Sequence, residues 1–456
     1  MLKSSLTAEQ KRELYMKAYN ENKEEVDARI ADGIENYRKG YCKIRLTDKS
    51  GKPIIGKKIS LKQTSHDFKY GANIFLLDEF ENEEKNKKYR QLFKEYFNLA
   101  TVPFYWDSLE PQQGKPRYDK NSKKIYRRPA PDLCIDYCEE NGIAAKLHCL
   151  VYEAFLPDWL PKYDMKAMEA LYEKRIKEIS ERYSGRLFEF EVINETLGMQ
   201  TRQDCVITKR RDVVEWAFKL ARKYLPYEKL VINEGNRAAF LADLGYRDPY
   251  FMQIEKCLLN GADIDKIGLQ HHIFTGVNDK TTEEYDKSIQ KVSPLVNPSK
   301  IFTALDMLSE FGLPLEITEI TIPTFGDTAE DEDLQADLLK LLYSIWFSHP
   351  SVENLVYWNS VENYCYVADK DPETAHWNEN RCRGALFHND LTPKKSALMI
   401  KKLFTEIWHT DLTVTTDKDG YAEFKGFFGE YTANFDDIKI EFAIHKNESN
   451  RFDFLI

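Results

Sequence analysis

Two glutamates stand at the ends of short apolar runs in this 456-residue sequence. Glu195 closes the run 189–195 (EFEVINE), and Glu319 lies near the end of the run 314–320 (PLEITEI). Cleavage of a glycosidic bond needs two carboxyl groups in one cleft, one to protonate the leaving oxygen and one to attack the anomeric carbon. Glu195 and Glu319 are therefore the candidate catalytic pair. Their separation, which selects the stereochemical outcome, is not fixed by the sequence.

The run 267–272 (IGLQHH) ends in three further polar side chains, Gln270, His271 and His272. Because successive residues of a strand point to opposite faces, Gln270 and His272 share one face, and His271 takes the other. We therefore expect His272 rather than His271 in the cleft.

Two more acids lie in the same runs and are not expected to catalyse. Glu191 precedes Glu195 by four residues, so alternation places it on the same face but deeper, as a buried structural acid. Glu316 has the opposite parity to Glu319 and is expected to face the surrounding helices.

The elements that would position these residues recur about every 40 residues through the middle of the chain, as a βα-repeat requires. Continuous apolar character predicts strands that are covered on both faces. These predicted strands begin near residues 71, 97, 144, 189, 229, 267, 314 and 352. Eight βα units predict an α/β fold of the (β/α)₈ TIM-barrel type, with the active site at the carboxyl ends of the strands. A doubly wound open sheet is the alternative, but no glycine-rich dinucleotide loop follows the first strand.

Both ends of the chain show a different pattern. Residues 1–40 are charged and periodic, and Thr7 and Gln10 form a capping box, which predicts one long amphipathic helix. Residues 41–66 alternate with period two around a turn at 48–53, which predicts a β-hairpin. Residues 411–456 alternate in the same way around a turn at 417–420. We expect 41–66 and 411–456 to form one small accessory β-sandwich beside a barrel of residues 67–410.

Composition narrows the possible partners. The net charge of −10 argues against a nucleic acid, and there is no apolar run of about 18 residues that could cross a membrane. The eight cysteines show no metal-type spacing with histidine, so buried free thiols are expected, and neither a metal nor a cofactor is predicted. Without a signal sequence the chain as written is expected to be cytoplasmic, and a secreted protein whose leader was removed would look the same. The oligomeric state stays open.

From about residue 66 to 408 the sequence resembles glycoside hydrolase family 10, the β-1,4-xylanases. Two segments carry the resemblance most strongly: 190–195 (FEVINE) is similar to the acid/base motif of that family, and 312–320 (GLPLEITEI) is similar to its nucleophile signature. Supporting matches occur in the expected order along the chain, at Trp106-Asp-x-x-Glu110-Pro, His148, Leu156-Pro-x-Trp159, Asn233-Glu, Gln270-x-His272 and Trp358.

The resemblance implies a role for several residues. Glu195 would be the acid/base and Glu319 the nucleophile of a retaining double displacement. Asn194 would donate to the sugar 2-hydroxyl, and Trp358 would stack on the face of the same sugar. His148, Asn233, Gln270 and His272 would complete the substrate-binding set.

Four departures from the family pattern bear on the substrate. Thr101, Val102 and Tyr105 stand where the family has a polar grip on the next sugar. Tyr152 and Glu153 replace a Trp-His pair, so a third acid is expected to enter the cleft.

The remaining two departures lie after the nucleophile. Thr321 replaces an acid that orients the cleft histidine, so His272 gains a hydrogen-bond partner but no negative charge. Tyr366 stands where a second tryptophan is usual.

The expected function is hydrolysis of β-1,4-xylosidic bonds in xylan, with decorated xylan or xylo-oligosaccharides as substrates. The alternatives are a hydrolase or transglycosylase of another β-linked glycan, and a non-catalytic carbohydrate-binding barrel. A binding barrel would be expected to have lost one of the two catalytic carboxylates, and this chain keeps both. Internal versus terminal cutting is not decided by the sequence.

Overall fold

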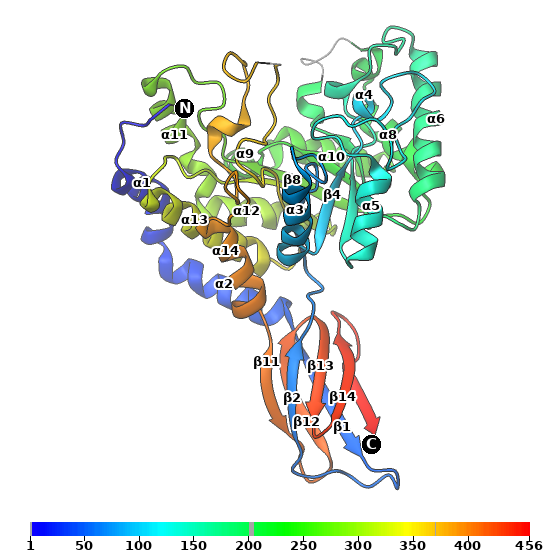
Figure 1. Cartoon of the computed structure of the whole chain (residues 1–456), viewed down its shortest axis with the longest axis vertical. Helices are drawn as coiled ribbons and strands as arrows, with labels where there is room; N and C mark the ends of the chain where they lie inside the picture. Colours follow the sequence, from blue (N-terminus) through cyan, green and yellow to red (C-terminus); the bar gives the residue numbers. More distant parts are fainter. Residues whose placement is uncertain (1, 200–204, 370) are drawn as a thin grey trace.

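A computed structural model describes residues 2–199, 205–369 and 371–456. Figure 1 shows a large α/β part with a small β-sandwich projecting from one side of it, and both ends of the chain contribute to that sandwich.

The α/β part is a closed barrel of parallel strands. The barrel strands are β3 (Lys69–Asn73), β4 (Leu99–Pro103), β5 (Ala144–His148), β6 (Glu189–Asn194), β7 (Leu230–Glu234), β8 (Lys266–His272), β9 (Leu315–Thr321) and β10 (Val352–Tyr357). They follow one another in chain order around the barrel, and β10 closes it against β3. The predicted TIM barrel is confirmed, and each of the eight predicted strands forms.

Helices surround the barrel and cover its strands. The principal ones are α3 (Glu83–Tyr96), α5 (Pro131–Glu140), α6 (Met165–Tyr183), α8 (Val213–Tyr224), α9 (Ala238–Leu244), α10 (Pro249–Leu259), α11 (Thr282–Val292), α12 (Pro298–Ser309), α13 (Ala329–Ser348) and α14 (Lys395–Lys402). Short turns shape the active-site end, among them α4 (Trp106–Leu109), η1 (Glu153–Phe155) and η6 (Glu379–Cys382). Among the described residues, no helix is both long and apolar enough to cross a membrane.

The N-terminal segment forms two helices, α1 (Ala8–Glu21) and α2 (Lys23–Tyr37), so the prediction of one long helix was wrong. The capping box of Thr7 and Gln10 is present. Asn22 ends the first helix because its side-chain amide donates to the Ala18 carbonyl at 2.9 Å and its backbone N–H donates to the Tyr19 carbonyl at 3.1 Å. Both helices pack on α13 along the side of the barrel.

The accessory strands form two facing sheets around a core of their own. One sheet has the order β12-β1-β15 and the other β11-β2-β13-β14. The strands are β1 (Lys39–Thr47), β2 (Lys58–Gln63), β11 (Asp411–Thr415), β12 (Tyr421–Phe427), β13 (Gly429–Phe435), β14 (Ile438–Ile444) and β15 (Arg451–Leu455). Alternate residues fill the space between the sheets, including Ile44, Leu46, Ile59 and Leu61, which are fully buried.

The predicted hairpin of residues 41–66 is wrong, because β1 and β2 belong to different sheets. β1 pairs antiparallel with β12 and parallel with β15, whereas β2 pairs antiparallel with β11 and β13. The strands on either side of the turn at 417–420, β11 and β12, are divided between the sheets in the same way. Alternation identifies a strand with one buried face, but it does not identify the partner of that strand.

The floor of the barrel holds a buried charge cluster in place of an apolar core. Lys146 Nζ lies 2.6 Å from Glu316 and 3.2 Å from Glu189, and Lys266 Nζ lies 2.8 Å from Glu189. The Asn354 amide donates to both glutamates. Glu316 therefore faces the barrel interior, and the prediction that it faces the helices was wrong.

A β-bulge explains the position of Glu316. Leu269 on β8 pairs with Ile317, and the next residue, Gln270, pairs with Glu319, so Thr318 is an extra residue in β9. An extra residue resets the alternation of a strand. Glu316 and Glu319 consequently both point into the barrel, although they are three residues apart.

All eight cysteines are buried free thiols, as expected.

Candidate active site

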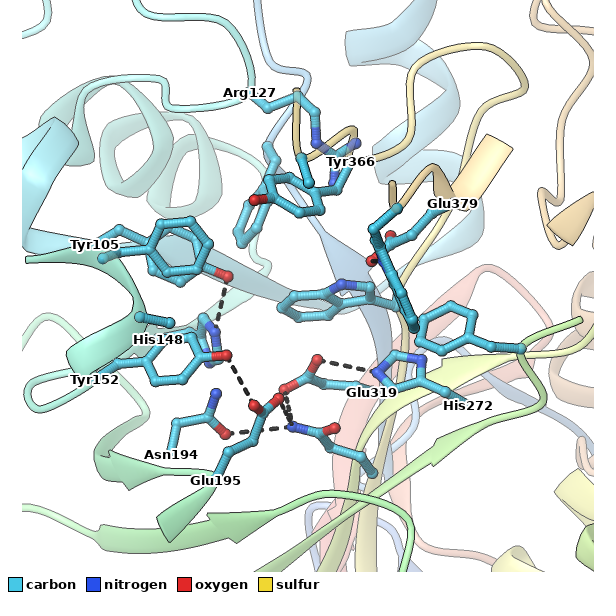
Figure 2. A pocket seen from close by; sticks show the side chains of 18 of the residues that line it. Tyr105, Arg127, His148, Tyr152, Asn194, Glu195, His272, Glu319, Tyr366 and Glu379 are labelled. Carbon is cyan, nitrogen blue, oxygen red and sulfur yellow. Dashed lines mark hydrogen bonds and ion pairs between the residues drawn. The ribbon is translucent and has the colours of Figure 1, made fainter. Parts of the chain in front are cut away.

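The carboxyl ends of the barrel strands surround a pocket of about 470 Å³. Ten of the predicted site residues line it, namely Tyr105, His148, Tyr152, Asn194, Glu195, Gln270, His272, Glu319, Trp358 and Tyr366. Figure 2 shows Glu195 and Glu319 directed toward one another at one end of this pocket, with Arg127 and Tyr366 at the other end.

Backbone irregularities aim both glutamates. Glu319 points into the pocket because of the bulge in β9. β6 has a similar extra residue between Glu191 and Ile193, and Glu195 follows this strand with a left-handed backbone (φ 51°, ψ 51°). A residue other than glycine seldom adopts this conformation, and strained residues of this kind cluster at functional sites.

The Gln270 side-chain amide bridges the two glutamates. Its Nε2 donates to Glu319 Oε1 at 2.9 Å and to Glu195 Oε1 at 3.0 Å. A single nitrogen that contacts both oxygens keeps these two oxygens less than about 6 Å apart. The Tyr152 hydroxyl donates to the other oxygen of Glu195 at 2.8 Å.

Glu319 is buried beneath this bridge, and burial is the largest influence on its pKa, which is raised well above the ordinary value. The charges of Glu191 and Glu195 raise the pKa of Glu319 further, while the charge of His148 and the Asn233 amide lower it. The Asn233 Nδ2 donates to Glu319 Oε1 at 3.1 Å and to Asn194 Oδ1 at 3.0 Å.

His272 is the cleft histidine, as predicted, and His271 packs against Trp346 on the opposite side of β8. The Nε2 of His272 lies 3.2 Å from Glu319 Oε2, and its Nδ1 lies 2.9 Å from the Thr321 hydroxyl. Burial lowers the pKa of His272 to about 4, so the imidazole is neutral at neutral pH. The contact with Thr321 is the uncharged one expected from the sequence.

His148 has the opposite electrostatic setting. Burial lowers its pKa, but the neighbouring Glu191, whose Oε1 lies 2.9 Å from His148 Nδ1, outweighs burial and raises the pKa above the ordinary value. The Nε2 of His148 contacts the Tyr105 hydroxyl at 3.0 Å. Glu191 is thus a buried partner of His148, as the sequence indicated.

Aromatic rings form much of the pocket wall. Trp358 packs edge-on against Phe75 (5.3 Å between centroids) and His148 (5.2 Å). Tyr105 and Phe155 continue this wall, with 4.4 Å between their centroids. Such faces suit the apolar C–H surface of a sugar ring.

Two predicted binding residues do not line the pocket. Asn233 is fully buried and acts on the pocket only through Glu319 and Asn194. Glu153 is only 2% exposed, and it lies behind the wall within electrostatic range of Tyr172 and Cys205. The turn η1 separates neighbouring side chains, so Tyr152 and Ala154 line the pocket while Glu153 does not. The expectation of a third acid from this position was wrong.

A third acid reaches the pocket from elsewhere. Glu379, in η6, lines the pocket, and its carboxylate accepts hydrogen bonds from Asn359 at 3.0 Å and from Trp377 at 3.4 Å. Arg127 and Arg128 also line the pocket, from the long connection between α4 and α5. The sequence analysis missed these residues because they lie in irregular loops rather than at strand ends, and the only signal was the unusual length of the loops.

A (β/α)₈ barrel with two close glutamates at the carboxyl ends of its strands has the fold and the carboxylate pair of a glycoside hydrolase. Within that class the chain belongs to glycosyl hydrolase family 10, whose model matches residues 62–402. The family resemblance predicted from the sequence is confirmed.

Several curated relatives are similar over most of this chain. Anti-sigma-I factor RsgI6 of Acetivibrio thermocellus is 26% identical over 403 residues, which cover 87% of this chain and 45% of the relative. Endo-1,4-beta-xylanase 2 of Arabidopsis thaliana is 24% identical, covering 83% of this chain and 31% of the relative. The chain thus spans less than half the length of these relatives.

Solved structures share the barrel fold. The structure of xylanase 10B from Thermotoga petrophila RKU-1 in complex with xylobiose has a TM-score of 0.57 and 19% identity, and the match covers 74% of this chain and 94% of that one. Native xylanase 10B from Thermotoga maritima gives a TM-score of 0.56 and 20% identity, with coverage of 74% and 94%.

Proposed function

We propose that this protein hydrolyses β-1,4-xylosidic bonds with retention of configuration, with Glu319 as nucleophile and Glu195 as acid/base. The substrate class is xylan, and decorated xylan or xylo-oligosaccharides fit best. The names of the xylanase relatives and family membership support the substrate class.

One observation carries the mechanistic proposal: the single Gln270 amide nitrogen that contacts both carboxylates. Inverting enzymes hold their carboxyl groups about 6.5–9.5 Å apart to admit a water, whereas retaining enzymes hold them about 5–5.5 Å apart. The limit of about 6 Å on the distance between the nearest oxygens lies below the inverting range, which favours direct attack by one carboxylate.

The hydrogen bonds around Glu319 favour its role as nucleophile. Burial raises the pKa of Glu319 and so opposes ionisation, but N–H donors from Asn233 and Gln270 stabilise the anion. A neutral His272 can donate a third hydrogen bond from Nε2 while its Nδ1 accepts one from Thr321.

The two steps then use the same pair of residues. Glu319 attacks the anomeric carbon while Glu195 protonates the leaving oxygen, and the C–O bond breaks to leave a covalent glycosyl-enzyme. Glu195 next removes a proton from water, which displaces Glu319 and releases the sugar with its original configuration. Asn194 and Trp358 would hold the sugar at the reacting position by its 2-hydroxyl and its ring face.

A non-catalytic role is the second candidate. The observation that favours it is the relative named as an anti-sigma factor, whose match covers 87% of this chain. The presence of both carboxylates and of their bridge favours catalysis over this alternative.

The deciding experiment is product analysis by NMR on linear xylo-oligosaccharides, glucuronoxylan, arabinoxylan and mixed-linkage glucan. Release of xylo-oligosaccharides whose newly formed ends are first β-anomers is expected. Glu319→Ala should abolish release, while Glu255→Ala on the exposed face of α10 should leave it intact. First-formed α-anomers would refute the retaining mechanism, and binding to xylan without any release would favour the non-catalytic role.

A further inference from the structure

Two consecutive arginines connect the pocket to a second hollow beside it. This neighbouring hollow has a volume of about 1170 Å³. Arg127 and Arg128 line both cavities, together with Phe155, Tyr366 and Ala368. In Figure 2, Arg127 lies beside Tyr366, at the end of the pocket away from Asn194 and Glu195. A group attached to a sugar in the pocket could therefore extend past the arginines into the hollow.

Both arginines are deeply buried and lack a carboxylate partner among the described residues. Arg127 is 4% exposed and Arg128 is 9% exposed. Arg127 Nη1 donates to the Tyr364 carbonyl, and its Nε is buried without a hydrogen-bond partner. Arg128 Nη1 donates to the Arg127 carbonyl at 2.9 Å. Arginine stays charged in proteins, and burying a cation without a counter-ion costs free energy. This cost indicates that a bound ligand supplies the negative charge.

The local structure fixes the direction of these side chains. The Arg128 guanidinium carbon lies 4.1 Å from the centroid of the Tyr105 ring and 5.3 Å from that of Phe155, a stacking arrangement that leaves the guanidinium edge free to donate. Arg127 has a left-handed backbone with φ 58°, which is unusual for a residue other than glycine. This turn lets two successive side chains line the same cavities.

The charges nearby limit the kind of ligand. Asp107 also lines the hollow. Burial raises the pKa of the Asp107 carboxyl, and the charge of Arg128 lowers it by a smaller amount. In the described part of the chain, no ion pair joins Asp107 to Arg128. Glu195 and Glu319 at the other end of the pocket would repel a multiply charged anion, and so would Glu379, whose backbone N–H donates to the Tyr366 carbonyl at 2.9 Å. A single carboxylate matches the forked geometry of a guanidinium and adds only one negative charge.

We propose that Arg127 and Arg128 bind the carboxylate of a uronic acid substituent on the glycan chain. The inference rests on the proposed function and specifies which decoration is preferred. It also gives Tyr105 a role, because the ring that replaces a polar side chain of the family supports Arg128.

The test compares two matched substrates at neutral pH. One is a xylotetraose with a single glucuronic acid branch, and the other is the same molecule after reduction of its carboxyl group to the alcohol. The measured quantity is the ratio of kcat/KM for the acidic substrate to that for the neutral one, in which general damage to the site cancels. Because charge-assisted hydrogen bonds are involved, we expect a ratio of about 10 to 100 for the wild type.

Variants assign this preference to the arginines. Arg127→Gln and Arg128→Gln should each lower the ratio toward one, whereas Arg247→Gln, at an exposed position outside both cavities, should keep the wild-type ratio. If a variant fails to fold, the wild type alone remains informative, because salt at about 1 M should reduce its ratio by screening. A wild-type ratio of one or less, or a ratio unchanged in both arginine variants, would overturn the proposal.

Failure of the proposed function gives a different result. In that case neither substrate is cleaved, and calorimetric binding of the same two oligosaccharides to the wild type and to the arginine variants replaces the kinetic ratio. A preference for the acidic oligosaccharide that depends on the arginines would support the carboxylate site without catalysis, and equal affinities would refute it.

Discussion

Replacing Gln270 with leucine removes the bridge between the two glutamates and changes the side-chain volume little. The wild-type amide donates at 2.9 Å to Glu319 and at 3.0 Å to Glu195 from a side chain that is only 4% exposed. A hydrogen bond to a charged group contributes about 1.5–3 kcal/mol, and substrate hydroxyls or water can replace part of the loss. We therefore expect a loss of about 2–4 kcal/mol of transition-state stabilisation, or about 30- to 1000-fold in kcat/KM.

The assay is hydrolysis of a chromogenic aryl β-xylobioside, with kcat and KM measured separately. Most of the loss should appear in kcat, because the amide contacts the two reacting carboxylates rather than a distant part of the substrate. Gln290→Leu, at an exposed position of α11, is the matched control, and urea unfolding checks that both variants are folded. A folded Gln270→Leu variant with kcat/KM within about threefold of the wild type would refute the bridging role, since even one such bond is worth more.

Three further predictions concern the nucleophile and the barrel floor. Glu319→Ala should be inactive, and added azide should give a glycosyl azide whose anomeric configuration is opposite to that of the substrate. NMR detects this configuration, and an azide product of unchanged configuration would exclude Glu319 as nucleophile. Burial raises the pKa of Glu319, and the anion is the reactive form, so kcat/KM should fall as pH decreases through a pKa above the ordinary value of 4.5; full activity at pH 4 would contradict this. Lys146→Met leaves Glu316 without its buried partner at 2.6 Å and should lower the free energy of unfolding by about 3–5 kcal/mol in urea titrations. The matched change Lys174→Met breaks the exposed pair with Glu178 and should lower the free energy of unfolding by no more than about 0.5 kcal/mol. Equal losses in the two variants would be inconsistent with a stabilising role of the buried cluster around Lys146.

The barrel could be predicted from the sequence because its strands are buried on both faces and read as continuous apolar runs. The same runs end in polar residues, so their carboxyl ends identified Glu195, Gln270, His272 and Glu319. These residues do line one pocket.

The errors have physical causes that a single sequence does not reveal. The inference that Glu316 faces the helices assumed regular alternation along β9 from Glu319. The extra residue Thr318 interrupts that alternation, so Glu316 points into the barrel instead. In the sandwich, alternation marked β1 and β2 correctly as strands but carried no information about their partners. Glu379 and Arg127 reach the pocket on irregular loops, where no periodicity relates sequence position to direction.

The pairing of β1 with β12 and β15 determines the order in which the protein can fold during synthesis. Lys39 pairs with Phe427, and Thr47 pairs with Leu455, so β1 cannot complete its sheet until the strands that follow the barrel have been made. The contacts of such strands span nearly the whole chain and form slowly. While the barrel emerges from the ribosome, β1 and β2 are exposed strands that a chaperone could bind, and the sandwich is completed only after β15 has left the ribosome.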